Sequence, residues 1–275
     1  MELLLPSPLV EISDERLGDV RLLLKRDDLI HPEVPGNKWR KLKYNLAAAA
    51  EQGHDTLLTF GGAYSNHIRA TAVAGSIFGF RTVGVIRGEE HLPLNPVLAF
   101  ATAQGMRLEY VSRTAYRDKP VPPGRFYVLP EGGSNALAVR GCIELAEEIT
   151  EPYDVLCCPV GTGGTLAGLA LGMREGARAL GFAVLKGGGF LRDETARLQR
   201  EYGRENSAWS VQTEFHFGGY ARRTPELDAF AADFEDRHGV RLDRVYTGKM
   251  LCGLYAMIRR GEFPPGIRIV AVITG

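Results

Sequence analysis

The chain has 275 residues, of which 45% are apolar, and its 33 basic and 33 acidic residues leave a formal net charge of zero. This composition allows a substantial core, and the balanced charge argues against a nucleic-acid or anionic-membrane surface as the main function. The sequence has no window of transmembrane length and no secretory pattern, so we expect a cytoplasmic protein.

Apolar runs typical of strands alternate with helical patterns along the chain. In chain order we predict a helix from near Lys38, a strand at 56–60, a helix at 66–78, a strand at 82–86, a helix at 95–104, strands at 107–111 and 126–129, a helix at 135–149, a strand at 154–160, a helix at 165–180, a strand at 182–185, helices at 194–202, 225–237 and 249–260, and a strand at 267–273. This alternation predicts an α/β fold with mostly parallel sheets that helices cover on both faces.

The four cysteines, Cys142, Cys157, Cys158 and Cys252, include no Cys-x-x-Cys pair. Neighbouring residues on a strand point to opposite faces, so Cys157 and Cys158 are poorly placed to bind one metal ion. We therefore expect buried, reduced thiols and no metal site.

The most informative residue is Lys38, within the basic segment 34–44. Pro35 and Gly36 mark a loop, and Asn37 is predicted to cap the next helix, which places Lys38 in its first turn. There the helix dipole disfavours a protonated amine, and a partly buried lysine becomes more nucleophilic. A solvated basic helix face and a nucleic-acid patch are the alternatives for this segment.

A glycine-rich loop at 161–165 follows a predicted buried strand and opens a helix. Backbone N–H groups at a helix N-terminus, left accessible by glycines and joined by the hydroxyls of Thr162 and Thr165, can bind a phosphate. The spacing fits neither the dinucleotide fingerprint nor a nucleotide P-loop, so we predict the single phosphate of a small cofactor. A tight strand–helix turn without a ligand is the alternative.

A second loop, at 61–67, also joins a predicted strand to a helix. Ser65, Asn66 and His67 offer a hydroxyl, an amide and an imidazole near free N–H groups, which could bind a carboxylate without an arginine. An ordinary helix cap is the alternative here.

Two further loops, at 131–135 and 245–249, are predicted to connect a strand to a helix in the same way. Ligands of parallel sheets bind at the carboxyl ends of the strands. We therefore expect all four loops at one edge of the fold.

Four motifs occur in chain order: Gly-Asn-Lys-x-Arg-Lys-Leu at 36–42, Gly-Gly-x-x-Ser-Asn-His at 61–67, Gly-Thr-Gly-Gly-Thr at 161–165 and Val-Tyr-Thr-Gly-Lys at 245–249. As a set they resemble the family of aminocyclopropanecarboxylate deaminase and D-cysteine desulfhydrase. These are pyridoxal-phosphate enzymes of the tryptophan-synthase-β-like fold type. The similarity covers most of the chain, while the segment 186–220 looks shortened.

The resemblance implies how pyridoxal 5'-phosphate would be held. Lys38 would form the Schiff base, Asn66 would contact the 3-oxygen, and Thr247 would meet the pyridine nitrogen. The residues that would bind the phosphate are Gly161, Thr162, Gly163, Gly164 and Thr165, together with Lys41.

The resemblance also implies a substrate site. Ser65, Asn66 and His67 would receive the substrate carboxylate, Tyr246 would stand near the substrate, and Tyr220 would correspond to a second active-site tyrosine. Lys38, Ser65 and Tyr246 are accordingly the predicted catalytic residues.

Two positions depart from the deaminase pattern, which resembles this chain but carries glutamate in place of Thr247 and glutamine in place of His67. A carboxylate would keep the pyridine nitrogen protonated and strengthen the electron sink, whereas a hydroxyl would leave that nitrogen closer to neutral. Loss of a good β-leaving group requires less electron withdrawal by the cofactor than opening of a cyclopropane ring does. We therefore predict β-elimination from a small amino acid, as in D-cysteine desulfhydrase, giving a 2-oxo acid, ammonia and sulfide.

The alternatives are 1-aminocyclopropane-1-carboxylate deamination and a non-catalytic phosphate- or nucleotide-binding module. The predicted organisation is a larger cofactor-binding domain, 1–43 with 151–275, and a smaller inserted α/β domain, 44–150. The cofactor would lie between them, where clefts commonly form. The resemblance implies a homodimer.

Overall fold

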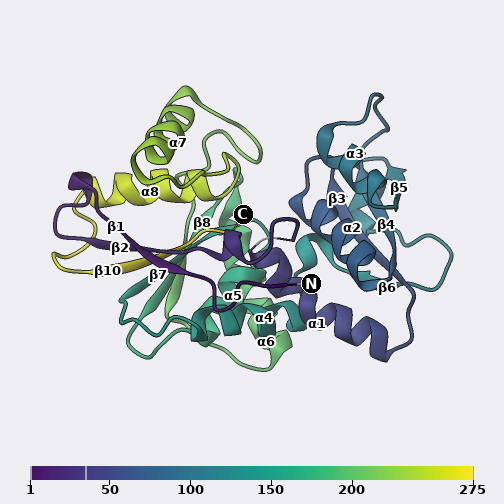
Figure 1. Ribbon diagram of the computed structural model, residues 1–275, viewed down its shortest axis with the longest axis horizontal. Coiled ribbons are helices and arrows are strands. Elements are labelled where there is room, and N and C mark those ends of the chain that lie inside the picture. The colour runs from purple at the N-terminus through teal and green to yellow at the C-terminus, as the bar shows by residue number, and fades with distance from the viewer. Residues whose placement is uncertain (1, 35, 275) are drawn as a thin grey trace.

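The computed structural model describes residues 2–34 and 36–274, which are built on two sheets (Figure 1). Pro35, where we predicted the loop before the first helix, lies outside these residues. The six-stranded sheet has the order β1-β2-β10-β7-β8-β9. Its strands are β1 Leu9–Ile12, β2 Arg21–Lys25, β7 Val155–Val160, β8 Arg178–Ala183, β9 Trp209–Gln212 and β10 Arg268–Val272. All its strand pairs are parallel except β1 with β2.

The four-stranded sheet has the order β5-β4-β3-β6 and is parallel throughout. Its strands are β3 Thr56–Gly62, β4 Arg81–Arg87, β5 Met106–Val111 and β6 Tyr127–Leu129. We call the parts built on the six-stranded and four-stranded sheets the larger and smaller lobes.

Helices flank both sheets. They are α1 Asn37–Glu51, α2 Asn66–Phe78, α3 Pro96–Ala103, α4 Ala136–Glu147, α5 Gly164–Gly172, α6 Leu191–Tyr202, α7 Pro225–His238 and α8 Thr247–Arg259. Short 3-10 helices add η1 Glu15–Leu17, η2 Asp27–Leu29, η3 Ala115–Asp118, η4 Glu131–Gly133 and η5 Gly188–Phe190. The predicted α/β class with mostly parallel sheets is confirmed.

The six-stranded sheet is covered on both faces, with α4, α5 and α6 on one side and α7 and α8 on the other (Figure 1). Cys157 packs into the core that contains α7 and α8, whereas its neighbour Cys158 packs into the core beside α4 and α5. The two thiols therefore point to opposite faces, as the sequence predicted. All four cysteines are buried and free.

Several local predictions need correction. The helix predicted to run to residue 180 ends at Gly172, where the extended backbone of Met173 stops it, and β8 begins at Arg178 after a turn in which Gly176 has a left-handed φ of 81°. The prediction also missed the short strands β1, β2 and β9.

Our prediction that Asn37 caps α1 is wrong. The capping position is Gly36, with φ 57°, and Asn37 is the first helical residue, its side chain turned toward α5. Glycine is required at position 36 because a Cβ there would lie 1.9 Å from the carbonyl oxygen of Thr274.

The loop at 245–249 also differs from the prediction, because it directly follows helix α7 and an irregular segment, and no strand lies between α7 and α8 among the described residues. Residues 240–246 form an irregular segment whose turn is fixed by Asp243. The Asp243 carboxylate accepts backbone hydrogen bonds from Val245, Tyr246 and Thr247 at 2.6–2.8 Å. This carboxylate, rather than a strand end, positions the start of α8.

The strands of the smaller sheet all lie between residues 56 and 129, whereas α4, at 136–147, packs mainly against α5 of the larger lobe. Helix α1 connects the lobes, because its C-terminal half joins the core that contains Leu57 and Leu129. Within the described residues, no helix is long and apolar enough to cross a membrane.

Candidate active site

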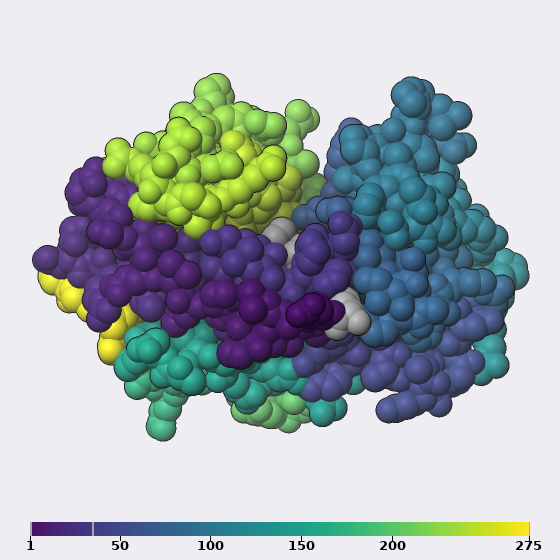
Figure 2. All heavy atoms as spheres, viewed as in Figure 1, coloured from purple at the N-terminus to yellow at the C-terminus, as the bar shows by residue number. Residues whose placement is uncertain are grey.

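A cleft of about 310 Å³ lies between the two lobes, at the carboxyl ends of β3, β4 and β7. The predicted site residues that line it are Lys38, Lys41, Ser65, His67, Gly161, Thr162, Gly163, Thr165, Tyr220 and Tyr246. Asn66, Gly164 and Thr247 were predicted as site residues but are not among its lining residues. In Figure 2, a notch separates the blue surface of the smaller lobe from the yellow-green surface over α7 and α8.

Lys38 lies in the first turn of α1, as predicted, and its Nζ donates a hydrogen bond to Asn37 Oδ1 at 3.0 Å. The ammonium also lies 5.8 Å from the centre of the Tyr246 ring. Burial, and then the charge of Lys41, lower the pKa of Lys38 to about 7. Near neutral pH, Lys38 is therefore a neutral amine in a large fraction of the molecules, and the neutral amine is the nucleophilic form.

Asn37 connects this lysine to the glycine-rich loop. Its Nδ2 donates to Thr165 Oγ1 at 2.9 Å while its Oδ1 accepts from Lys38. Thr165, in the first turn of α5, is the acceptor in this bond. The side-chain amide of Asn37 thus fixes the position of the Lys38 amine relative to the glycine-rich loop.

The loop itself forms a cup at the N-terminus of α5. Gly163 has a left-handed φ of 79°, and a Cβ on Gly164 would lie 2.6 Å from Ser134 Oγ. Both glycines are needed to bring the backbone N–H groups close to neighbouring hydroxyls. The hydroxyls of Ser134 and Thr162 are 2.7 Å apart and complete the wall.

Lys41 is the clearest sign that this cup binds an anion. Its side chain is only 3% exposed, and Nζ donates to Gly132 O at 3.1 Å, Ser134 Oγ at 3.0 Å and Thr162 Oγ1 at 3.5 Å. No hydrogen bond or ion pair among the described residues joins it to a carboxylate. Burial lowers the pKa of Lys41. A buried cation without a counterion, beside a helix N-terminus, fits a phosphate group.

The loop after β3 provides a second anion site. Ser65 caps α2 by accepting from the Ile68 N–H at 3.4 Å, which leaves its own hydroxyl proton free. Asn66 and His67 open the helix, where backbone N–H groups have no partner within the helix. This arrangement suits a carboxylate that approaches from the cleft.

His67 is 2% exposed, and its protonation can be assigned from its neighbour. Thr59 Oγ1 donates its single proton to Leu129 O at 3.1 Å, so at the 2.9 Å contact it must accept from His67 Nε2. Burial, together with the charges of Lys38 and Lys41, holds the pKa of His67 well below its usual value. The ring is therefore neutral, and its unpartnered Nδ1 is an acceptor. The imidazole cannot donate to a carboxylate, so only the backbone N–H of His67 can do so.

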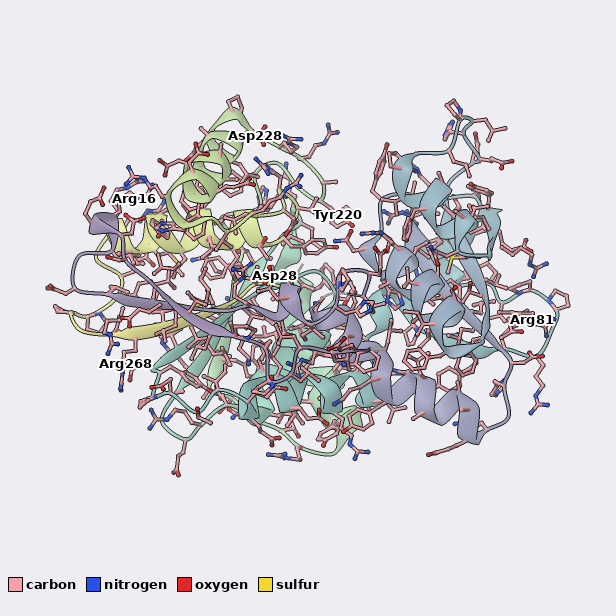
Figure 3. All side chains as sticks on the ribbon, viewed as in Figure 1. Arg16, Asp28, Arg81, Tyr220, Asp228 and Arg268 are labelled. Carbon is pink, nitrogen blue, oxygen red and sulfur yellow. The ribbon has the colours of Figure 1, made fainter. Side chains whose placement is uncertain are left out.

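Tyr246 and Tyr220 form the wall opposite this loop, and Figure 3 shows Tyr220 on the side of the larger lobe that faces the smaller one. Tyr246 Oη donates to Tyr220 Oη at 3.2 Å, and the rings meet edge to face. Burial and the neighbouring Tyr220 raise the pKa of Tyr246 well above its usual value. Tyr246 therefore stays a neutral phenol. Its ring packs against Gly161, whose added Cβ would lie 3.4 Å away.

Thr247 is buried, and its hydroxyl donates to Asp243 Oδ2 at 2.6 Å and accepts the Asp243 N–H at 3.2 Å. The hydroxyl proton of Thr247 is thus already donated to Asp243, within the turn that starts α8. The role predicted for Thr247 at the pyridine nitrogen stays a prediction.

Sequence reasoning missed several groups of the cleft. Asn37 and Ser134 lay inside the motifs we had singled out, but they were assigned as helix caps or loop residues. Arg87, at the end of β4, and Glu131 also line the cleft, and Glu131 pairs with Lys119 at 2.9 Å. Arg87 is the last residue of β4 and is followed by the single Gly88, but this strand end lacks the paired glycines of the loops at 61–67, 131–135 and 161–165, so it was not singled out.

The family model of pyridoxal-phosphate dependent enzymes matches residues 2–275 of this chain. The chain belongs to this family. The buried, unneutralised Lys41 and the glycine cup supply what the phosphate of such a cofactor requires, and Lys38 lies beside them as the amine. The predicted cofactor and enzyme class are therefore confirmed.

Relatives within this pyridoxal-phosphate family support the resemblance drawn from the motifs. The chain is 33% identical to the "Bifunctional D-cysteine desulfhydrase/1-aminocyclopropane-1-carboxylate deaminase, mitochondrial" of Arabidopsis thaliana, over 92% of this chain and 72% of that protein. It is 31% identical to a "D-cysteine desulfhydrase" of Klebsiella pneumoniae, over 98% of this chain and 91% of the other. A crystal structure of an "ACC deaminase homologue" matches 100% of this chain and 90% of its own, with a TM-score of 0.85 and 27% identity.

Proposed function

We propose that this pyridoxal-phosphate enzyme catalyses β-elimination from a small amino acid, with a thiol as leaving group, and releases a 2-oxo acid, ammonia and sulfide. The observation that carries the proposal is the amine of Lys38, partly neutral near pH 7, between an anion cup and the wall formed by Tyr220 and Tyr246. When bound, the cofactor supplies the electron sink for the charge left on the substrate α-carbon.

The residues of the cleft would divide the work as follows. The Ser65 hydroxyl and the N–H groups that open α2 would bind the substrate carboxylate. Lys38 Nζ, held by Asn37, would take the α-proton. The C–S bond would then break with its electron pair on sulfur, and water would convert the released aminoacrylate into the 2-oxo acid and ammonia. The neutral phenol of Tyr246 would supply a proton at the leaving group.

The composition of the cleft favours this reaction over ring opening. Among the described residues that line it, Glu131 is the only carboxylate, and it is already paired with Lys119. A sink without a carboxylate partner is weaker, which suits the loss of a good leaving group more than the opening of a cyclopropane. Deamination of 1-aminocyclopropane-1-carboxylate is kept as the second candidate because relatives carry that name. The non-catalytic module is set aside, since the family consists of enzymes.

A substrate comparison tests the proposal. Purified protein loaded with pyridoxal phosphate would be assayed with D-cysteine, L-cysteine and 1-aminocyclopropane-1-carboxylate, with the 2-oxo acid, ammonia and sulfide measured. We expect pyruvate and sulfide from a cysteine enantiomer; formation of 2-oxobutanoate as the main activity would reject the proposal in favour of the deaminase.

Lys38→Ala should abolish both turnover and the visible absorbance of the lysine-bound cofactor. Lys43→Ala is the matched control, because Lys43 lies on the same helix but pairs with Glu144 outside the cleft. The cytoplasmic location and the homodimer also remain proposals, which cell fractionation and light scattering would test.

A further inference from the structure

A second buried lysine lies behind the cleft wall and not in the cleft lining. Lys249, on α8, is 0% exposed, and its Nζ donates to three backbone carbonyls: Gly219 O at 2.7 Å, His216 O at 2.9 Å and Val184 O at 3.1 Å. All three of its donors are used. No ion pair between described residues includes this lysine.

Burying a charged lysine without a carboxylate partner reduces the stability of the fold. A lysine is almost never fully buried, and burial without a carboxylate disfavours its charged form. Burial accordingly lowers the pKa of Lys249 to about 8. A methionine or leucine would fill the same space without this cost, so the position is explained by the three carbonyls and not by packing.

The carbonyls belong to two segments that meet at the cleft. Val184 follows β8 and precedes Leu185, which lines the cleft. His216 and Gly219 lie in the irregular segment 213–223, which we call the tyrosine loop because it carries Tyr220. One side chain therefore joins this loop to the residue that follows β8.

Phe215, buried in the core, and the ion pair of Glu214 with Arg260 anchor the start of the tyrosine loop, whereas its turn at 217–221 has an unfavourable backbone. Phe217 and Ala221 have left-handed φ values of 49° and 56°, which are unfavourable for residues with a Cβ, and Gly218 and Gly219 also have positive φ. A backbone in this conformation persists only where surrounding contacts fix it. The three bonds from Lys249 are such contacts, and the two to His216 and Gly219 lie on either side of Phe217 and Gly218.

We propose that Lys249 is a positioning residue that holds the tyrosine loop in place as one wall of the substrate cleft. Through this loop it sets Tyr220 against Tyr246, and so governs substrate binding without contributing to the cofactor cup. None of its three partners belongs to the cup around Lys41. The part of the inference that concerns substrate rests on the proposed function, whereas the part that concerns the loop does not.

The test compares three variants of the cofactor-loaded enzyme. Lys249→Met removes all three donors at nearly constant volume, and Lys249→Gln keeps two. Lys186→Met is the matched control, because Lys186 is exposed and lies next to the tyrosine loop, with its Cβ 3.7 Å from the place of a Gly219 Cβ. The readouts are the cofactor's visible absorbance, steady-state KM and kcat, and the rate of limited trypsin cleavage after the exposed Arg222 and Arg223.

For Lys249→Met we expect unchanged cofactor absorbance, cleavage at least tenfold faster at Arg222 and Arg223, and a KM at least tenfold higher with a smaller change in kcat. Lys249→Gln should fall between this variant and the wild type, and Lys186→Met should match the wild type. Wild-type cleavage and KM in Lys249→Met would overturn the inference, as would loss of cofactor absorbance.

If Lys249→Met does not fold, Lys249→Gln is judged by the same criteria. Trypsin cleavage needs no substrate, so it decides the role of Lys249 even if none of the assayed amino acids is turned over, an outcome that would reject the proposed function alone.

Discussion

The cofactor cup and the tyrosine loop face each other across one cleft but are built in opposite ways. The cup is assembled from side chains of several elements, with Lys41, Ser134 and Thr162 bonded to one another and Asn37 bonded to Thr165. The start of the tyrosine loop is anchored in the core by Phe215, but its turn is held through backbone carbonyls that accept from one lysine of α8. A fixed cup suits a cofactor common to the family, and a loop whose turn depends on one lysine leaves room for substrate selection to vary.

The contrast between the cup and the tyrosine loop can be tested by substitution, and the largest loss of cofactor affinity is expected for a substitution in the cup. Lys41→Met removes the buried cation, and a hydrogen bond to a charged group contributes about 1.5–3 kcal/mol, so affinity for pyridoxal phosphate should fall roughly 10- to 150-fold. Titration of the cofactor-free protein, followed by visible absorbance, measures this. Lys43→Met serves as the control on the same helix; equal affinities for the two variants would refute the assignment of Lys41 to the cup.

A smaller effect, on the rate of cofactor binding, is expected from the pH dependence of Lys38, which lies between the two regions. Because the pKa of Lys38 is lowered to about 7, its nucleophilic neutral form is scarce below pH 7 and dominant above it. The rate at which cofactor-free protein binds pyridoxal phosphate covalently should therefore rise about tenfold between pH 6 and pH 8 and then level off. Stopped-flow absorbance would record it. A rate that still climbs tenfold per pH unit above pH 8 would mean that Lys38 has an ordinary lysine pKa.

The smallest effect is expected on the tyrosine side. Tyr220→Phe removes one hydrogen bond at a partly exposed position. Such a bond contributes about 0.5–1.5 kcal/mol, so kcat/KM for the preferred amino acid should fall roughly 2- to 10-fold while cofactor affinity stays constant. Tyr202→Phe, at the end of α6 and away from the cleft, is the control. A loss of cofactor affinity in Tyr220→Phe would erase the contrast between the two regions.

The sequence predicted the cup better than the tyrosine loop, for a physical reason. The cup depends on glycines, hydroxyls and a lysine at fixed spacing near a helix start, which a local pattern reveals. The support of the tyrosine loop depends on carbonyl oxygens of Val184, His216 and Gly219, between 30 and 65 positions from Lys249. Every residue type carries such a carbonyl, so no pattern could have pointed to these three.

The same distinction applies to the fold. Helices α2 and α7 and the buried strand β7 follow from periodicity and capping residues, and their bounds agree with the prediction to within one residue. The boundary between α5 and β8 was misplaced because residues 173–180 continue a helix-like composition, while the backbone is already extended at Met173. Asn37 was misassigned because its amide bonds to Thr165, which is 128 residues away in the sequence.

The position of β10 has a consequence for how the chain is made. This strand, Arg268–Val272, lies in the middle of the six-stranded sheet and pairs with both β2 and β7. The smaller sheet is complete once β6 has emerged at Leu129, but about 140 residues separate that point from β10. At roughly 5–20 residues per second, the ribosome needs on the order of 10–30 s for this stretch. During that interval β2, and β7 once it has been made, lack their shared partner β10, so the larger sheet is completed well after the smaller one.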